Sequence, residues 1–286
     1  MQIDTFKRDR RTGQYLFDNL VFSVKPYFLN PDNSSLNSSN PEQIQMAASS
    51  ASAQIPIQSV EEGGVEISKL TCQRNAACLI EIADETRKHK ITGRPCHVDT
   101  IFGDGMEPFV LPESVFIGRK EPLLFRATDI SGNANNIRPV FVSQRIITDR
   151  ARDPKLDAYL VERQVRSRYA LPYLCPLDEN PALDGDAEGE YNFTEDARGH
   201  FEVRKLTYKS TGVFKFKITD ETGQSLTNNW VYSSAGLGTA HEPFILPTPW
   251  VIKAGGIVKF TIKDLSGSSN TIYLTLSGRM LFLSRR

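Results

Sequence analysis

Cysteine and histidine side chains, which bind metals and act as nucleophiles or bases, are few in this sequence. There are four cysteines, at Cys72, Cys78, Cys96 and Cys175. Cys96 and the adjacent His97 could join Cys72 and Cys78 in a metal site, but no closely spaced C-x2-C pair anchors one. Four cysteines in 286 residues are also far fewer than a disulfide scaffold uses. We therefore expect buried thiols in strands and no cofactor or metal.

The common catalytic motifs do not occur. The sequence has no His-Glu-x-x-His zinc pair and no Gly-x-Ser-x-Gly nucleophile turn. The glycines of Ser234–Gly238 are not followed by the Lys-Ser/Thr pair that a phosphate-binding loop requires. We therefore expect that the protein is not an enzyme. An enzyme with a site between two domains is an alternative that a pair of facing carboxylates would support.

One acidic stretch has the residue types that bind Ca²⁺. Asp184–Glu190 spaces its carboxylates between glycines. It lacks the twelve-residue ligand pattern that ends in a bidentate glutamate. We therefore expect a solvated acidic loop over Leu177–Asp196.

The charge balance excludes a further class of function. The chain has 34 basic and 34 acidic residues, so its formal net charge is zero. A protein that binds nucleic acid mainly through electrostatics needs an excess of Lys and Arg. No segment has the roughly 20 apolar residues of a membrane span, and residues 1–11 lack the apolar stretch of a secretory signal. We expect a soluble protein with no membrane partner and no specific nucleic-acid partner.

The most informative feature is an internal duplication. Glu107–Pro112 reads Glu-Pro-Phe-Val-Leu-Pro, and Glu242–Pro247 reads Glu-Pro-Phe-Ile-Leu-Pro. The match continues to Asp129–Gly132 and Asp264–Gly267, and 12 of the 42 positions after residue 105 are identical to those after residue 240. Upstream, 65–71 matches 201–207. Two homologous units therefore run from about 63 to 147 and from about 199 to 282.

The repeated residue types are those of folding rather than of catalysis. The two prolines within each hexamer suit an edge or entry segment, and the Phe and Leu between them should be buried. The aspartates of the later match should bond nearby backbone amides in a turn. The residues expected to have this structural role are Glu107, Pro108, Phe109, Leu111, Pro112, Asp129, Gly132, Glu242, Pro243, Phe244, Leu246, Pro247, Asp264 and Gly267.

The patterning within each unit predicts β structure. Val213–Ile218 alternates apolar and charged residues, as a half-buried strand does. Gly255-Gly256 lies between two strand-like runs and predicts a tight hairpin. Closely spaced strands of this kind indicate a sandwich or barrel. The predicted fold is all-β, with two tandem homologous antiparallel β-sandwich (jelly-roll-like) domains joined by a short helix.

The remaining segments complete the predicted domain organisation. Residues 1–150 should form the first domain, with 31–57 as a flexible arm because it is rich in Asn, Ser, Ala and Gln. Residues 151–175 should be a helical linker that begins at Asp153, and 176–286 should form the second domain. The linker carries arginines that could contact an anionic partner, Arg163, Arg166 and Arg168.

The order Glu-Pro-Phe-Φ-Leu-Pro, then Asp-x-Ser-Gly-x-x-Asn, resembles a recurring motif in structural proteins of tailed bacteriophages. The resemblance implies small β-sandwich modules on the head, at the head–tail junction or on the tail. It also implies location in the virion, and partners among major capsid, portal or tail components and further copies of the chain. It therefore predicts a non-enzymatic virion structural protein, assembled in multiple copies. One departure concerns the closing strand, where Ser143-Gln-Arg145 replaces Gly278-Arg-Met280.

The alternative function is a receptor- or carbohydrate-binding sandwich. Aromatic rings stack on sugar faces, and Trp230, Tyr232 and Trp250 could supply such rings.

Overall fold

The computed structural model describes most of the two duplicated units. The described residues are 7–8, 14–17, 20–30, 39–40, 42–58, 64–85, 88–118, 121–148, 170–179, 181, 185–192, 199–220, 223 and 225–282. Arg163, Arg166 and Arg168, with most of the expected helical linker, lie outside these residues. We call residues 7–148 the first sandwich and residues 170–282 the second sandwich.

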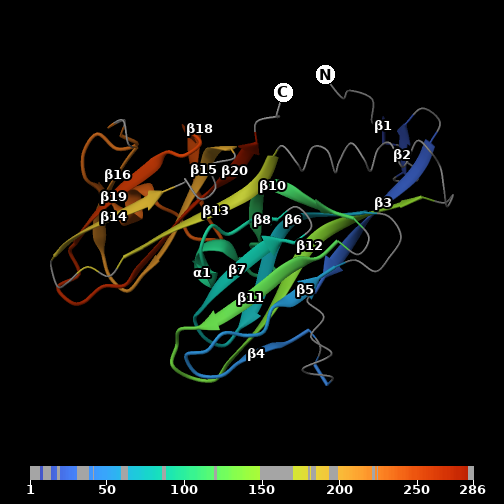
Figure 1. Ribbon diagram of the computed structural model, residues 1–286, viewed down its shortest axis with the longest axis horizontal. Coiled ribbons are helices and arrows are strands. Elements are labelled where there is room, and N and C mark those ends of the chain that lie inside the picture. The colour runs from blue at the N-terminus through green and yellow to red at the C-terminus, as the bar shows by residue number, and fades with distance from the viewer. Residues whose placement is uncertain are drawn as a thin grey trace.

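The first sandwich consists of two antiparallel sheets (Figure 1). Its elements are β1 (Lys7–Arg8), β2 (Gln14–Phe17), β3 (Leu20–Leu29), β4 (Ile44–Met46), β5 (Ile55–Ile57), β6 (Gly64–Arg74), β7 (Cys78–Asp84), β8 (His89–Lys90), β9 (Cys96–His97), α1 (Val98–Ile101), β10 (Phe109–Ile117), β11 (Leu123–Asp129) and β12 (Asn135–Thr148). One sheet has the order β1-β2-β3-β12-β6-β10, with β4 also paired to β12. The other has the order β5-β11-β7-β8, with β9 also paired to β7.

The second sandwich repeats this plan with fewer strands. Its elements are β13 (Ala170–Glu179), β14 (Asp186–Asn192), β15 (Gly199–Ser210), β16 (Phe214–Asp220), β17 (Val231–Tyr232), α3 (Ser233–Gly236), β18 (Phe244–Ile252), β19 (Ile257–Asp264) and β20 (Ile272–Phe282). The sheets have the orders β13-β20-β15-β18 and β14-β19-β16-β17.

Both sandwiches are jelly rolls. In the second, the eight strands counted from β13 to β20 lie in the orders first-eighth-third-sixth and second-seventh-fourth-fifth. The same orders appear in the first sandwich when β3, β5, β6, β7, β9, β10, β11 and β12 are counted. Two four-stranded sheets joined in this way are the two Greek keys of a jelly roll. The predicted fold class, all-β with two tandem sandwiches, is confirmed.

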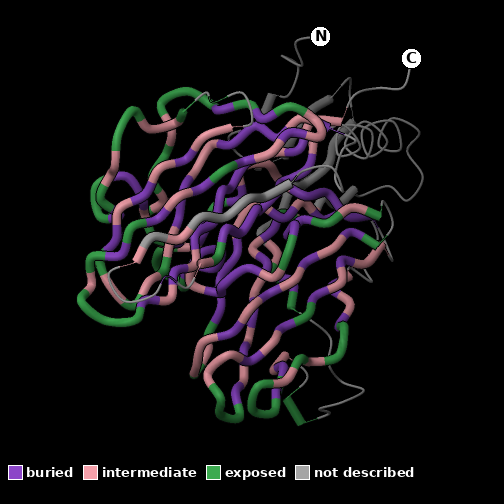
Figure 2. The backbone as a smooth tube through the Cα atoms, turned by 60° about the vertical axis from the view of Figure 1, so that its left-hand side comes forward, coloured by how far each residue is buried: buried purple, intermediate pink, exposed green. Residues whose placement is uncertain are grey.

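Period-two alternation builds the two cores. In β16, Phe214, Phe216 and Ile218 are buried, and the lysines between them are only partly covered. In the first sandwich, Phe102 and Phe125 meet edge to face, with ring centroids 6.4 Å apart. Buried and partly buried residues alternate along many strands of both sandwiches, and exposed residues gather in the loops at the ends of the strands (Figure 2).

The segment 31–57 differs from the flexible arm that its composition suggests. Its described part contains β4 and β5, whose apolar side chains Ile44, Met46, Ile55 and Ile57 are buried in the first sandwich. Each strand is only three residues long, with one apolar residue at either end. The simple polar sequence around them masks that pattern, so the expectation of an arm is wrong for this part.

Three further segments differ from expectation. Asp186–Asn192 of the predicted acidic loop is strand β14, paired with β19. Ala170–Glu179, partly assigned to the helical linker, is strand β13. The turn at Gly255 is present, with a positive φ of 77°, but the strands that it joins lie in different sheets. Residues 253–256 therefore connect the two layers of the sandwich rather than close a hairpin.

Candidate functional site

Each Glu-Pro-Phe segment is positioned by a glycine for which the sequence alone predicted no such role. A Cβ on Gly103 would lie 2.0 Å from the Glu107 carbonyl oxygen. A Cβ on Gly238 would lie 2.1 Å from the Glu242 carbonyl oxygen. The backbone of each segment folds over its glycine, so only a residue without Cβ fits. The signal was in the sequence, because the two glycines lie at the same distance before the two hexamers.

The prolines of the motif lie on sheet edges. Both β10 and β18 are the last strands of their sheets. Pro112 lies between Val110 and Val115, where the ladder to β6 is interrupted. Pro247 lies in the corresponding interruption of β18. An edge strand tolerates a residue that cannot donate a hydrogen bond, because one side of its backbone has no ladder to form.

The two motif copies differ in burial. Phe109 is fully buried and Leu111 is nearly so, as expected. The expectation is wrong for the second copy, where Phe244 is 38% exposed and Leu246 is partly exposed. The burial of the two copies differs because their surroundings differ. Phe109 lies against the second sandwich, with the Lys205 Nζ 5.4 Å from its ring centroid.

The turn aspartate of the first sandwich organises its whole motif. Asp129 Oδ1 accepts hydrogen bonds from the Ser131 hydroxyl at 2.7 Å and from Asn135 Nδ2 at 3.2 Å. Its Oδ2 accepts from the backbone N–H groups of Ser49 and Gly132, at 2.8 and 3.1 Å. Burial opposes the charge, but these hydrogen bonds outweigh it and lower the pKa of Asp129 to about 2. The aspartate, serine and asparagine of the motif thus form one unit.

The second sandwich repeats this unit. Asp264 accepts from the Ser266 hydroxyl at 3.0 Å and from Asn270 Nδ2 at 2.9 Å. Gly132 and Gly267 have φ angles of 75° and 67°, a region that glycine adopts without strain. Sequence reasoning placed the aspartates and glycines in turns but did not assign a role to the asparagines.

Buried polar contacts also form a seam between the two sandwiches. Leu174, in β13 of the second sandwich, is fully buried in the core cluster of the first. Its carbonyl accepts from Gly93 N–H at 2.9 Å, and its N–H donates to the Ile91 carbonyl at 2.8 Å. Residues 91–93 therefore extend the edge of β13 through main-chain hydrogen bonds.

Buried threonines link helix α1 to the second sandwich. The hydroxyl oxygens of Thr100 and Thr275 are 2.7 Å apart, and the Thr207 hydroxyl donates to the Thr100 carbonyl at 2.8 Å. The His97 ring lies against Tyr273, with ring centroids 4.3 Å apart. Burial lowers the pKa of His97 to about 4, so this imidazole is neutral at physiological pH.

An ion network crosses the seam beside the threonines. Arg279 binds Glu202 at 3.0 Å and reaches Glu113 of the first sandwich at 3.4 Å. Arg204 binds the other oxygen of Glu202 at 2.6 Å. Burial alone would raise the pKa of Glu202, but the hydrogen bonds from Arg279 and Arg204 lower it below its usual range.

Further polar contacts close the two ends of the seam. Asp99 of α1 pairs with Arg74 of its own sandwich and with Lys209 of the second, the latter at 3.3 Å. His241 Nδ1 lies 3.2 Å from the Glu107 carbonyl oxygen, so the two Glu-Pro-Phe segments touch.

The seam joins two unlike faces. We call residues 91–93, α1, residues 102–108 and β10 the edge face of the first sandwich. We call β13, β20 and β15 the sheet face of the second sandwich. Apart from that of His241, the contacts above run from the edge face of the first sandwich to the sheet face of the second.

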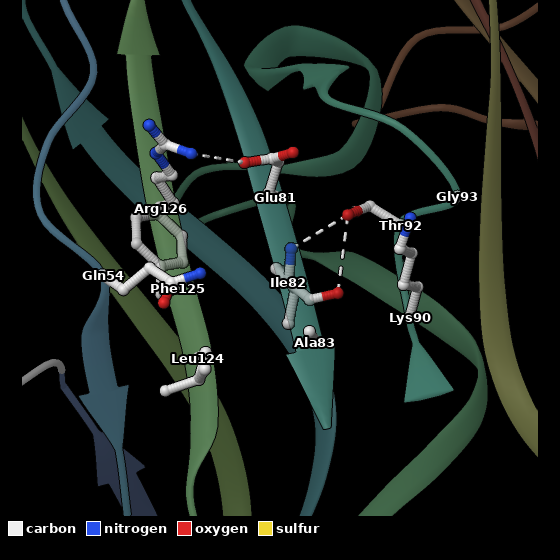
Figure 3. A pocket seen from close by; sticks show the side chains of 10 residues that line it. All are labelled: Gln54, Glu81, Ile82, Ala83, Lys90, Thr92, Gly93, Leu124, Phe125 and Arg126. Atoms are coloured by element: carbon white, nitrogen blue, oxygen red, sulfur yellow. Dashed lines mark hydrogen bonds and ion pairs between the residues drawn. The ribbon is translucent and has the colours of Figure 1, made fainter. Parts of the chain in front are cut away.

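A shallow hollow of about 140 Å³ lies beside the seam, on the sheet formed by β5, β11, β7 and β8 (Figure 3). At its floor the Thr92 hydroxyl accepts from the Ile82 N–H at 2.9 Å. Arg126 and Glu81 pair across one rim at 3.8 Å. This volume is below that of typical ligand pockets, and Thr92 fixes the segment that bonds to Leu174.

A larger hollow of about 420 Å³ lies on β6 and β12 of the first sandwich. Its lining is mixed and contains Asn30, Glu42, Thr71, Cys72, Gln73, Asp104, Gly105, Arg138, Pro139 and Val140. Arg138 within it donates to Gln73 and Gln43, at 3.3 and 2.6 Å.

The aromatic residues proposed for sugar stacking do not form one platform. Trp250 is largely buried. Lys217 Nζ lies 4.7 Å from the Trp230 ring centroid, and Lys215 Nζ lies 4.7 Å from that of Tyr232. Each of these two rings therefore has a lysine ammonium against it.

The cysteines have the environment expected of structural thiols. Cys72, Cys78, Cys96 and Cys175 are all free and buried in strands. Burial raises the pKa of Cys78 to about 12, so its thiol stays protonated. Within the described ranges, no three His, Cys, Asp or Glu side chains are grouped as metal ligands. No described helix is long and apolar enough to cross a membrane.

No protein-family model matches the chain, and no curated protein matches it. Among solved structures, the major capsid protein P2 from bacteriophage PM2 is 9% identical, with a TM-score of 0.40, over 92% of this chain and 99% of that one. A chain from the triple jelly-roll turret assembly of an archaeal virus is 10% identical, with a TM-score of 0.27, over 93% and 61%. The ANXUR2 extracellular domain from Arabidopsis thaliana is 8% identical, with a TM-score of 0.24, over 91% and 89%. These low scores do not assign a function, and the strand order alone identifies the fold.

Proposed function

We propose that the chain is a non-enzymatic structural protein of a virus particle, present in many copies. The observation that carries this proposal is the seam, which locks two jelly rolls of identical topology into one block. Jelly rolls serve as building blocks of viral capsids, and also occur in lectins and cupins. A capsid subunit needs rigid modules with broad contact surfaces rather than a deep pocket.

The chemistry of the described residues supports this role over catalysis. The repeated polar residues, Asp129 with Asn135 and Asp264 with Asn270, hold turns together. Polar side chains of the seam bond across the two sandwiches. Thr100 bonds to Thr275, and Arg279 bonds to Glu113. Duplication has thus preserved residues that fold each module, and the polar residues of the seam join the two modules.

Within the virion, a place in the shell is the position that the paired jelly rolls support best. The sequence motif resembles head, head–tail and tail proteins of tailed bacteriophages, and we therefore propose that the virus is a tailed bacteriophage. The partners would be further copies of the chain together with other virion components.

Quantitative mass spectrometry of gradient-purified particles tests this proposal. We expect the chain among the most abundant particle proteins, and antibodies against it should label the surface of intact particles. The chain found only in infected-cell lysate, with none in particles, would contradict the proposal.

A further inference from the structure

The duplication gives each sandwich both an edge face and a sheet face, but the seam uses one of each. Residues 239–242 already touch the first sandwich through Ala240 and His241, so the free edge face of the second sandwich consists of residues 226–228, α3, residues 237–238 and β18. The sheet face of the first consists of β3, β12 and β6. The alignment places the seam residues of α1, β10, β13, β15 and β20 at numbered positions on these two remaining faces, so the exposure of each position can be compared with that of its seam counterpart.

The edge face of the second sandwich is exposed where its counterpart is buried. Thr100, at the centre of the seam, corresponds to Ala235, and Asp99 corresponds to Ser234; both counterparts are exposed. Phe244, which corresponds to the fully buried Phe109, is 38% exposed, and the neighbouring Ile245 is 67% exposed. A strand edge that carries large exposed apolar side chains is typical of a surface that binds another protein.

The sheet face of the first sandwich is exposed in the same way. The pairing of β3 and β13 with their neighbours aligns Phe28 with Leu174. Leu174 is fully buried in the seam, whereas Phe28 is 65% exposed. A large apolar side chain therefore lies in water at a position that the seam covers in the other sandwich.

The larger hollow lies at the centre of this sheet face. Its lining includes Thr71 and Val140. These residues correspond to Thr207 and Thr275, which receive Thr100 of α1 in the seam. The hollow thus occupies the place where the other sandwich receives a helix.

We propose that copies of the chain dock head to tail, with the edge face of the second sandwich of one copy on the sheet face of the first sandwich of the next. This rests on the proposed function and names its partner, a second copy of the chain. The contact is heterologous, since two different faces meet, and a heterologous contact continues from copy to copy until a ring closes.

The internal seam also supplies the atomic pattern of the contact. In the seam, residues 91–93 add to the edge of β13 at Leu174. Residues 226–228 of one copy add to β3 of the next in the same way, at Phe28. Among the described strands, β2 pairs with β3 only as far as Ser23, which leaves Phe28 beyond that ladder.

The chemistry of the contact differs from that of the seam at several positions, among them the ion pair. The ion pair of Glu113 and Arg279 spans 3.4 Å in the seam. Its counterparts are Thr248 and Gln144, which are both uncharged and exposed. The contact between copies therefore depends more on apolar burial and less on charge, and it should be less sensitive to salt.

Two exposed positions allow a test that leaves the fold intact. Phe28→Asp places a charge on the sheet face, and Ile245→Asp places one on the edge face. Each should weaken self-association of the full chain by at least ~30-fold in sedimentation velocity experiments, because a charge would be buried at the contact. The matched control is Val213→Asp, since Val213 is 52% exposed outside both faces. Circular dichroism should show the same spectrum for all three variants.

Mixing the two variants tests the head-to-tail arrangement. Phe28→Asp retains its edge face, and Ile245→Asp retains its sheet face. An equimolar mixture should form a one-to-one pair that cannot grow further, although each variant alone is monomeric. A mixture that stays monomeric while the unaltered chain associates would overturn the proposal, and so would variants that associate as strongly as the unaltered chain.

A third variant should strengthen the contact. Thr248→Glu with Gln144→Arg copies the seam ion pair onto the two free faces. It should increase association relative to Thr248→Glu with Gln144→Glu, which places two like charges there. No difference between the two double variants would contradict the alignment of the faces.

If the chain is found in particles but these variants behave alike, only the docking proposal fails. If the variants behave as expected and particles lack the chain, only the virion role fails.

Discussion

At the scale of single residues, the buried polar groups of the seam link the two sandwiches to solution pH. His97 lies inside the seam, where its ring contacts Tyr273 and its Nδ1 accepts from Asp99 N–H at 3.1 Å. Burial lowers the pKa of His97 to about 4 from a usual value of 6.5. Between these two pH values the unfolded chain binds the proton and the folded chain does not, so stability falls as pH falls.

Replacement of His97 by Asn tests this linkage. Asn keeps an acceptor for the Asp99 N–H but does not titrate. Titration of His97 should remove on the order of 3 kcal/mol of unfolding free energy between pH 6.5 and 4, and His97→Asn should lack this loss. Burial raises the pKa of Asp178 to about 7, which acts in the opposite direction in both proteins, so the quantity to compare is the difference between the two pH profiles. Urea unfolding at a series of pH values measures both. Asp129 does not confuse the comparison, because its lowered pKa acts below this window. Parallel pH profiles for the two proteins would show that His97 is not the titrating group.

From the sequence, a role could be predicted only for residues that both copies retain. The turn aspartates Asp129 and Asp264 could be assigned because both copies retain them. The seam residues Thr100, Thr275 and Arg279 could not, because a seam between unlike faces uses different residues from each copy. A duplicated sequence thus shows what both modules need and conceals what joins them.

At the scale of elements, each Glu-Pro-Phe segment depends on the glycine beneath it. Gly103→Ala should lower the unfolding free energy by about 2 kcal/mol or more, because the Cβ would meet main-chain atoms that cannot move aside. Gly105→Ala is the matched control in the same loop, since a Cβ there meets nothing within 4 Å. Thermal unfolding compares the two variants. Equal stability of both would contradict the packing described for this loop.

Element prediction succeeded where a pattern was long. Val213–Ile218 has enough alternating residues to predict a strand, and β16 occupies that place. The strands β4 and β5 have three residues each, too few to show a period. The Gly255 turn was recognised, but local sequence cannot show whether the strands on either side share a sheet. That depends on contacts between strands far apart in the chain.

At the scale of the whole molecule, the seam should make the two sandwiches unfold together. Leu174 belongs to β13 of the second sandwich but is buried in the core of the first. Leu174→Ala should lower the unfolding free energy by about 3 kcal/mol through the cavity that it leaves. Calorimetry should then show two transitions in place of one. Leu265→Ala, at a position 37% exposed, is the control and should leave one transition. A single transition in Leu174→Ala would mean that the seam does not couple the sandwiches.

The central claim is that this pair of jelly rolls is a repeated unit of a viral shell. Cryo-electron microscopy of purified particles that contain the chain tests it most directly. The account predicts many copies in the shell, each with β18 of its second sandwich beside β3 of the first sandwich of a neighbouring copy. A reconstruction in which the chain is absent from the shell, or present there without contact between copies, would contradict it.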